Sequence, residues 1–138
     1  MGLEVVSATM ADRTATIALW QAAGLTRPWN DPEKDFDLAC GGATSDVLLA
    51  RDGEALAGSV MVGFDGHRGW VYYLAVDPAR RGEGIGRAMM QSAEQWLRDR
   101  DCPKIQLMVR SDNTTAKGFY SAIGYEEQAV VTIGRRLD

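Results

Sequence analysis

The sequence predicts an α/β (α+β) fold built on a mixed β-sheet, and two observations carry this prediction. Residues 70–76, "WVYYLAV", are apolar on both alternating faces, which is typical of a strand covered on both sides. A helix over 85–98 and a strand over 104–109 follow, and such a strand–helix–strand unit pairs its two strands in parallel. Strands over 46–51 and 55–64 flank the tight-turn sequence "RDGE" and form an antiparallel hairpin. The fold is therefore not all-helical.

The N-terminal third of the chain predicts one strand and two helices. A strand over 3–8 comes first. A helix over about 11–23 follows, in which Ile17 and Trp20 fall on one face. In "RPWNDPEKDFDLA", Asp31 is placed to cap a short second helix, with a proline at its first position.

The C-terminal part predicts two further helices and a last strand. In the helix over 85–98, apolar residues recur at helical spacing. A short helix over 113–125 has Asn113 as its N-cap and Gly124 just past its end. A final strand covers about 128–134.

Composition limits the class of protein. With 138 residues, 46% of them hydrophobic, residues 1–138 are expected to form one domain. The net charge of −4 argues against nucleic acid as the main partner. The sequence has neither a membrane-length apolar run nor a signal-peptide pattern, so we expect a cytoplasmic protein without a membrane partner. Cys40 and Cys102 lack CxxC spacing and nearby histidines, which indicates ordinary thiols and no metal site.

The segment "RRGEGIGR" (80–87) lies between the strand over 70–76 and the helix that follows. A helix N-terminus attracts anions, and glycines let the backbone approach a phosphate closely. Arginines add charge-assisted hydrogen bonds. The segment therefore predicts a site for a phosphorylated ligand, with a glycine-rich turn bearing solvated arginines as the alternative.

Two common nucleotide motifs do not match this segment. A Walker A loop needs Gly-Lys-Ser/Thr, but Gly86 is followed by Arg87 and Ala88. A dinucleotide fingerprint that starts at Gly82 needs a glycine where Arg87 stands. The acidic residue expected about twenty residues later is also missing from "CPKIQLMV".

A third motif does match. "RGEGIG" (81–86) is R-x-x-G-x-G directly after a strand, and it resembles the acetyl-CoA pyrophosphate loop of the GNAT acetyltransferases. "NTTAKGFYSAIGY" (113–125) is similar to the second signature of that family. The resemblance covers the whole chain. "LTRPWNDPE", "DGHRG", "YYL" and "CPKIQ" are most similar to the small YpeA-type branch.

The resemblance implies the GNAT fold, with a mixed, mostly antiparallel sheet of about six to seven strands, a central splayed parallel pair and about four helices. It also implies acetyl-CoA as co-substrate and no metal. The pantetheine arm would lie along the main chain of the strand over 70–76, and the pyrophosphate would bind the glycine loop. The implied acetyl-CoA-binding residues are Leu74, Ala75, Val76, Arg81, Gly82, Glu83, Gly84, Ile85, Gly86, Arg87, Asn113 and Tyr120.

The resemblance makes Tyr120 the catalytic candidate. It lies seven residues after Asn113, about two helical turns, so both side chains point to one side of their helix. A phenol placed at the sulfur can protonate the leaving CoA thiolate. The alternative is that Tyr120 belongs to an apolar face with Phe119 and Ile123.

The general base is left open. Many family members have a glutamate on the strand before the second motif, but this position is Met108, which cannot accept a proton. Water connected to a more distant group is the first candidate, and Asp65 and Glu83 are weaker ones.

In this family the acceptor usually enters over the first two helices. That implication makes Arg27, Trp29 and Asn30 candidate substrate residues, together with Asp65 and His67 in the turn "DGHRG". The alternatives are a packed connection in which Trp29 covers the core, and a solvated turn histidine.

The leading hypothesis is an acetyl-CoA-dependent N-acetyltransferase in which a primary amine attacks directly within a ternary complex. The acceptor would be a small-molecule amine or a peptide or protein amine. A non-catalytic acyl-CoA-binding or sensory domain of the same fold is the alternative. The oligomeric state is left open, with a homodimer as one candidate.

Overall fold

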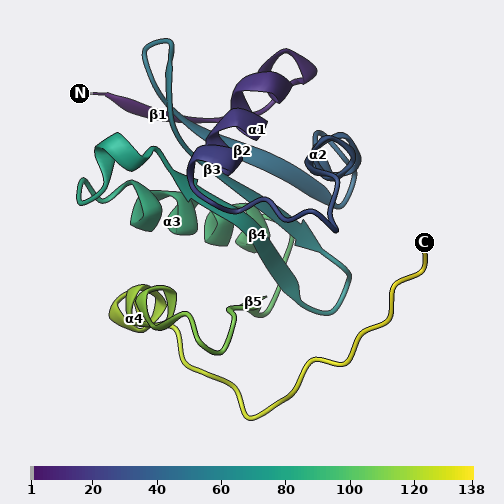
Figure 1. Cartoon of the computed structure of the whole chain (residues 1–138). Coiled ribbons are helices and arrows are strands. Elements are labelled where there is room, and N and C mark those ends of the chain that lie inside the picture. Colours follow the sequence, from purple (N-terminus) through teal and green to yellow (C-terminus); the bar gives the residue numbers. More distant parts are fainter. Residues whose placement is uncertain (1) are drawn as a thin grey trace. The chain divides into compact units, whose positions relative to one another are not determined.

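A computed structural model describes residues 2–138 (Figure 1). The chain divides into two compact units, one that ends at Met108 and one that spans Val109–Asp138. In chain order, the elements of the first unit are β1 (Leu3–Ser7), η1 (Met10–Asp12), α1 (Arg13–Ala22), α2 (Pro32–Ala39), β2 (Ser45–Asp52), β3 (Ala55–Phe64), β4 (Gly69–Val76), η2 (Pro78–Arg80), α3 (Ile85–Arg98) and β5 (Ile105–Leu107). The second unit contains α4 (Thr114–Ala122).

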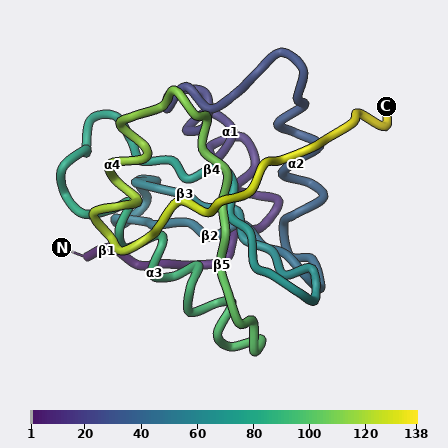
Figure 2. The backbone as a smooth tube through the Cα atoms, turned by 90° about the horizontal axis from the view of Figure 1, so that it is seen from below, coloured from purple at the N-terminus to yellow at the C-terminus, as the bar shows by residue number. Residues whose placement is uncertain are grey.

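The first unit is built on a five-stranded sheet with the order β1-β2-β3-β4-β5. The first four strands pair antiparallel, and β4 pairs in parallel with β5 across α3. The predicted hairpin is confirmed, with β2 and β3 paired from Ser45 opposite Gly63 to Asp52 opposite Ala55 and a register shift between Ala50 and Arg51. The predicted crossover unit is confirmed as well, and Figure 2 follows it from β4 through α3 into β5.

Helices cover both faces of this sheet. Helices α1 and α2 pack on one face and α3 on the other (Figure 1). On the α1–α2 face, Trp20 and Phe36 are fully buried, with ring centroids 6.2 Å apart, and Ile17 packs against the same cluster. On the other face, α3 approaches β3 so closely that a Cβ at Gly58 would lie 2.8 Å from Ile85 Cγ2. Helices α1 and α3 also contact β4, as its apolar sequence indicates, but Tyr72 is left 44% exposed, so the strand is only partly covered.

The expected number of strands is wrong. The described residues form five strands instead of six to seven, and the predicted strand over 128–134 is not formed. Its side chains are strand-forming, but Val131 is 83% exposed and Ile133 is 90% exposed. A strand forms only where the backbone of a neighbouring strand pairs with it. Val109–Asp138 contains no strand that could be this neighbour. The parallel pair therefore lies at the edge of the sheet rather than at its centre. Strand β5 is also shorter than the predicted 104–109.

Local signals place the ends of α4 correctly. Asn113 Oδ1 accepts a hydrogen bond from the Ala116 amide at 3.0 Å, which is the predicted N-cap. Gly124, just beyond the helix, has φ +99° in the left-handed region that favours glycine. In residues 2–138, the helices are too short or too polar to cross a membrane.

Candidate functional site

Strand β4 extends well beyond its parallel partner. The β4–β5 pairing runs from Gly69 opposite Ile105 to Val71 opposite Leu107 and ends there, whereas β4 continues to Val76. On its other side, Ala75 and Val76 still pair with β3. In the described chain, the far end of β4 therefore has no strand on the β5 side. Backbone groups at such an edge need partners, and this is the stretch expected to bind a pantetheine arm.

A bulge marks the point where β4 leaves β5. The β3–β4 register shifts between Ser59 and Met61, opposite Tyr73, whose φ is +52°. This conformation is uncommon for a residue with a side chain and costs about 1–3 kcal/mol. Several contacts hold Tyr73 in place. Its ring stacks on Trp20 with centroids 3.9 Å apart, and its carbonyl accepts a hydrogen bond from Ser59 Oγ at 3.4 Å.

The glycine loop follows η2 and leads directly into α3. Gly82 and Gly84 have φ of +85° and +80°, and Gly84 is the N-cap of α3. A Cβ built on either glycine meets no atom of the described chain within 4 Å. No side chain of that chain caps the helix either, so the N–H groups of its first turn are open to a ligand. The loop can therefore bind an anion such as a pyrophosphate.

The three arginines of this loop divide into two kinds. Arg80 donates to Glu83 Oε1 at 3.0 and 3.1 Å and lies 3.1 Å from Asp52 Oδ2, so it fastens the loop to the β2–β3 hairpin. Arg81 and Arg87 are exposed and have no ion-pair partner among residues 2–138. These two are available for phosphate oxygens. The sequence did not separate the two kinds, because Asp52 lies 28 residues before Arg80 (80 − 52 = 28).

A cavity of about 550 Å³ lies beside the bulge, within the size range of small-molecule sites. Of the predicted substrate residues, Asn30 lines it. The other lining residues were not predicted from the sequence. The full lining is Leu25, Asn30, Asp35, Leu38, Ala39, Ser45, Met61, Tyr72 and Tyr73. One signal was present, because the spacing of 35, 38 and 39 on a short helix places these three residues on one face.

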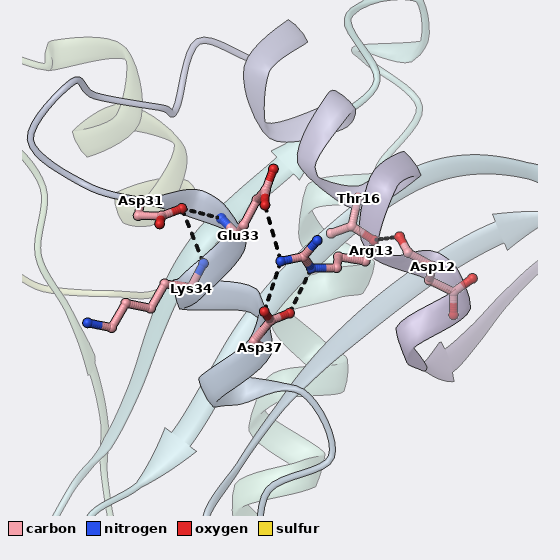
Figure 3. A network of polar contacts seen from close by, with 7 residues as sticks. All are labelled: Asp12, Arg13, Thr16, Asp31, Glu33, Lys34 and Asp37. Atoms are coloured by element: carbon pink, nitrogen blue, oxygen red, sulfur yellow. Dashed lines mark hydrogen bonds and ion pairs between the residues drawn. The ribbon is translucent and has the colours of Figure 1, made fainter.

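Two sets of polar contacts fix the orientation of α2 (Figure 3). Asp31 Oδ1 accepts hydrogen bonds from the Glu33 and Lys34 amides at 3.0 and 3.3 Å, as a cap does. Arg13 of α1 donates to both carboxylate oxygens of Asp37 at 2.8 and 2.9 Å and lies 3.2 Å from Glu33. The residues at 33 and 37, one helical turn apart, thus face α1.

Asp35 lies on the opposite face of α2, toward the cavity. The Tyr73 hydroxyl donates a hydrogen bond to Asp35 Oδ2 at 2.7 Å. Burial, with this hydrogen bond as the second cause, raises the pKa of Tyr73, so the phenol keeps its proton at neutral pH. Asp35 therefore enters the cavity as a carboxylate with one oxygen already bonded.

The other predicted substrate residues lie outside the lining. Arg27 donates to the carbonyls of Gly24 and Thr26 at 2.8 and 2.9 Å, which braces the α1–α2 loop. Trp29 lies in the same loop and is 56% exposed, so it does not cover the core.

The turn between β3 and β4 holds the remaining candidates. Asp65 Oδ1 accepts hydrogen bonds from the His67 and Arg68 amides, both at 2.8 Å. These hydrogen bonds lower the pKa of Asp65, and the one from Arg68 has the largest effect. The lower pKa makes this carboxylate a weaker base. His67 is exposed.

In the second unit, Tyr120 packs among aromatic rings. Its ring centroid lies 5.0 Å from that of Phe119 and 5.8 Å from that of Tyr125, both edge-on. Burial raises the pKa of Tyr120 to about 12, so the phenol is protonated at neutral pH and can act as a donor. Packing and proton donation, which the sequence left as alternatives, are therefore compatible.

The position where a glutamate could act as base holds Met108, which directly follows β5 and is half-exposed. Cys40 and Cys102 are free thiols. Within residues 2–138, no three His, Cys, Asp or Glu side chains gather into a group that could hold a metal ion.

Known proteins are similar to this chain in sequence and in fold. The family model described as the acetyltransferase (GNAT) family matches residues 14–125. Acetyltransferase ECA0875 from Pectobacterium atrosepticum is 45% identical over 126 residues, which are 91% of this chain and 89% of that protein. Acetyltransferase YE1169 from Yersinia enterocolitica is 41% identical over 135 residues, 98% of this chain and 96% of that protein. The solved structure of AAC(6')-Iy in complex with the bisubstrate analog CoA-S-monomethyl-acetylneamine matches 99% of each chain with a TM-score of 0.84. At 13% identity it shares the fold.

Proposed function

The chain belongs to the acetyltransferase (GNAT) family, and we propose that it is an N-acetyltransferase that moves the acetyl group of acetyl-CoA directly to a primary amine in a ternary complex. The observation that carries this proposal is the junction of two features. Strand β4 runs past its partner up to Val76, and the open glycine loop begins a few residues later. The first offers backbone groups to the amides of a pantetheine arm, and the second offers amides and two free arginines to its pyrophosphate.

The fold neighbour supports the same donor, because that protein was solved with an analog that joins CoA to an amine-bearing molecule. We also propose that residues 1–138 act as one domain, since the family match includes parts of both units. The resemblance to the YpeA-type branch and the cytoplasmic location stay predictions.

In the proposed reaction, the amine nitrogen attacks the acetyl carbonyl carbon. A C–N bond forms, the C–S bond breaks, and a backbone amide of β4 polarises the carbonyl oxygen. The CoA thiolate takes the proton of Tyr120, whose raised pKa keeps it protonated until this moment. The attacking nitrogen then carries one proton more than the amide product, and this proton passes through water to the Tyr120 phenolate and restores the phenol. With Met108 at the glutamate position, the proton of the acceptor ammonium leaves to water.

One observation favours the second candidate, a non-catalytic acyl-CoA-binding domain. Met108 removes the expected base, and Asp65 is engaged by backbone amides. Such a domain would bind acetyl-CoA and release no CoA to any amine.

One experiment separates the two. Acetyl-CoA is titrated into the protein by calorimetry, and free CoA is then followed with a panel of amines, with the acetylated product identified by mass. The enzyme hypothesis predicts binding and amine-dependent release. Binding without release for every amine would support the sensory domain, and absence of binding would contradict both.

A further inference from the structure

The cavity beside Asp35 indicates the chemical class of the acceptor, an inference that rests on the proposed acetyl transfer. We propose that the acceptor is a small primary amine with an apolar body and no negative charge. Its ammonium group binds the Asp35 carboxylate, and Tyr73 is the residue that positions this carboxylate.

The charge of the cavity favours a cation. Among its nine lining residues, all in the described part of the chain, Asp35 provides the single carboxylate, and none is Lys, Arg or His. Further carboxylates lie at Asp31, the N-cap of this short helix, and at Glu33 and Asp37 within it. The last two hold the nearby Arg13 on the face toward α1. An ammonium group would meet a complementary field in the cavity.

The lining of the cavity also disfavours acceptors that carry a negative charge. A carboxylate or phosphate on the acceptor would lose part of its hydration against a lining that offers it no Lys, Arg or His within the described chain. Desolvating a charge without a partner is costly, and here Asp35 adds repulsion. Free amino acids and sugar phosphates are therefore poor acceptors, although both carry amines.

The rest of the lining suits an apolar body. Leu25, Leu38 and Met61 contribute aliphatic surface, and Tyr72 presents a ring that is 44% exposed. Polar groups are few, at Asn30 and Ser45. A peptide carries a backbone amide at every residue, and these amides would find few partners there. The lining is better matched to an alkyl or aryl amine.

Tyr73 fixes the direction in which Asp35 offers its charge. The Tyr73 hydroxyl donates a hydrogen bond to Oδ2 of Asp35, which leaves Oδ1 of Asp35 for the ammonium group. The tyrosine is itself held by its stack on Trp20 and by the hydrogen bond from Ser59 to its carbonyl. The next residues along β4, Leu74 to Val76, are those proposed to bind the donor. The anchored amine would thus sit beside the donor's strand.

Two matched amines and two matched variants test the inference. 2-Phenylethylamine and L-phenylalanine share one skeleton and differ by a carboxylate. Each is titrated by calorimetry into the protein saturated with CoA, a dead-end complex that needs no turnover. We expect 2-phenylethylamine to bind, and Asp35→Asn to weaken it about 10- to 100-fold, the worth of a hydrogen bond to a charged group. Glu54→Gln, in the exposed turn between β2 and β3 and outside the cavity lining, also removes one negative charge and should leave this affinity unchanged.

The outcomes separate the two proposals. If CoA and acetyl-CoA do not bind, the proposed function fails. If CoA binds but L-phenylalanine binds as well as 2-phenylethylamine, or if neither amine binds, the acceptor class is wrong. If Asp35→Asn and Glu54→Gln behave alike, Asp35 is not the anchor of the ammonium group, and that part of the inference is overturned. Alaninamide, an uncharged mimic of a peptide N-terminus, binding more tightly than 2-phenylethylamine would indicate a peptide acceptor and overturn the inference.

The positioning role of Tyr73 has its own measurement. Tyr73→Phe keeps the ring that stacks on Trp20 and removes only the hydroxyl. With acetyl-CoA and 2-phenylethylamine, we expect KM for the amine to rise several-fold, with little change in kcat, in the affinity for acetyl-CoA or in Tm. A fall in both kcat and Tm, with KM for the amine unchanged, would show that Tyr73 has a structural role only.

Discussion

The glycine loop and the Asp35 cavity belong to the same unit, yet they are built in opposite ways. The loop is one contiguous stretch, 81–87, that would act through backbone N–H groups and two free arginines. The cavity is assembled from segments that run from Leu25 to Tyr73, and its central hydrogen bond joins residues 38 positions apart. The glycine loop can be recognised from a sequence motif, whereas no motif marks the Asp35 cavity.

The two sites also depend on different interactions to keep their geometry. At Gly82 and Gly84 a Cβ would meet no atom of the described chain within 4 Å, so the left-handed backbone, and not packing, selects glycine there. The cavity depends on orientation, because Asp35 faces it only while Arg13 holds Glu33 and Asp37 on the other side of α2. Substitutions in the loop should therefore act locally, and substitutions around α2 should act through geometry.

The loop side of this comparison is tested most strongly by Gly84→Asp. The carboxylate would stand where the pyrophosphate is proposed to bind, so we expect acetyl-CoA binding to be lost in calorimetry. The control is Gly53→Asp in the β2–β3 turn, where φ is +63° and the space for a Cβ is equally open. Gly53→Asp imposes similar backbone strain and should leave the affinity unchanged. Unaltered affinity in Gly84→Asp would place the phosphate site elsewhere.

Tyr120→Phe asks whether the second motif, which belongs to neither region, carries chemistry. Loss of a placed proton donor should lower kcat by about 10²–10⁴ while acetyl-CoA affinity is nearly kept. Tyr125→Phe, in the same aromatic cluster, is the control and should retain most of kcat. Full turnover of Tyr120→Phe at every pH would make Tyr120 a packing residue only.

The missing base predicts a pH profile. If no side chain accepts the acceptor's proton, kcat/KM should rise by up to about tenfold per pH unit through pH 8–9, toward an amine pKa near that of lysine, about 10.4. The raised pKa of Tyr120, about 12, keeps the donor protonated over this range, so the phenol should not lower the rate there. A plateau near pH 6.5 that disappears in Asp35→Asn, Asp65→Asn or Glu83→Gln would reveal a side-chain base.

Gly58→Ala tests the packing against β3 of α3, the helix that follows the glycine loop. A Cβ there would lie 2.8 Å from Ile85 Cγ2 and 3.1 Å from the Ala75 carbonyl oxygen, so α3 would have to shift. We expect the free energy of unfolding in urea to fall by about 1–3 kcal/mol. Gly63→Ala, also in β3, meets its nearest neighbour at 3.4 Å and should cost much less. Equal costs would show that α3 is not seated through Gly58.

The smallest expected effect separates the arginines. Arg81→Ala and Arg87→Ala should each weaken acetyl-CoA about tenfold, as the loss of one charge-assisted hydrogen bond does. Arg98→Ala, at the other end of α3, should have no effect on affinity. If Arg98→Ala weakens binding as much, the arginines act through net charge and not through contact.

Much of the fold could be predicted from the sequence because its signals are local. Caps at Asp31 and Asn113, a glycine past α4 and the helical spacing of α3 each depend on a few neighbouring residues. The hairpin and the parallel crossover followed from short apolar runs and turns. The glycine loop was visible for the same reason, since a left-handed backbone selects glycine directly.

The tertiary structure decided the rest. Val131 and Ile133 have strand-forming side chains, but a strand needs a paired neighbour, and sequence alone does not supply one. Arg80 and Arg81 are adjacent and alike in sequence, and only the approach of the β2–β3 hairpin sets Arg80 apart. Asp35 and Tyr73 meet across 38 residues because α2 is pinned to α1 and β4 bulges at φ +52°. Contacts of this range depend on how whole elements pack, which no short stretch of sequence encodes.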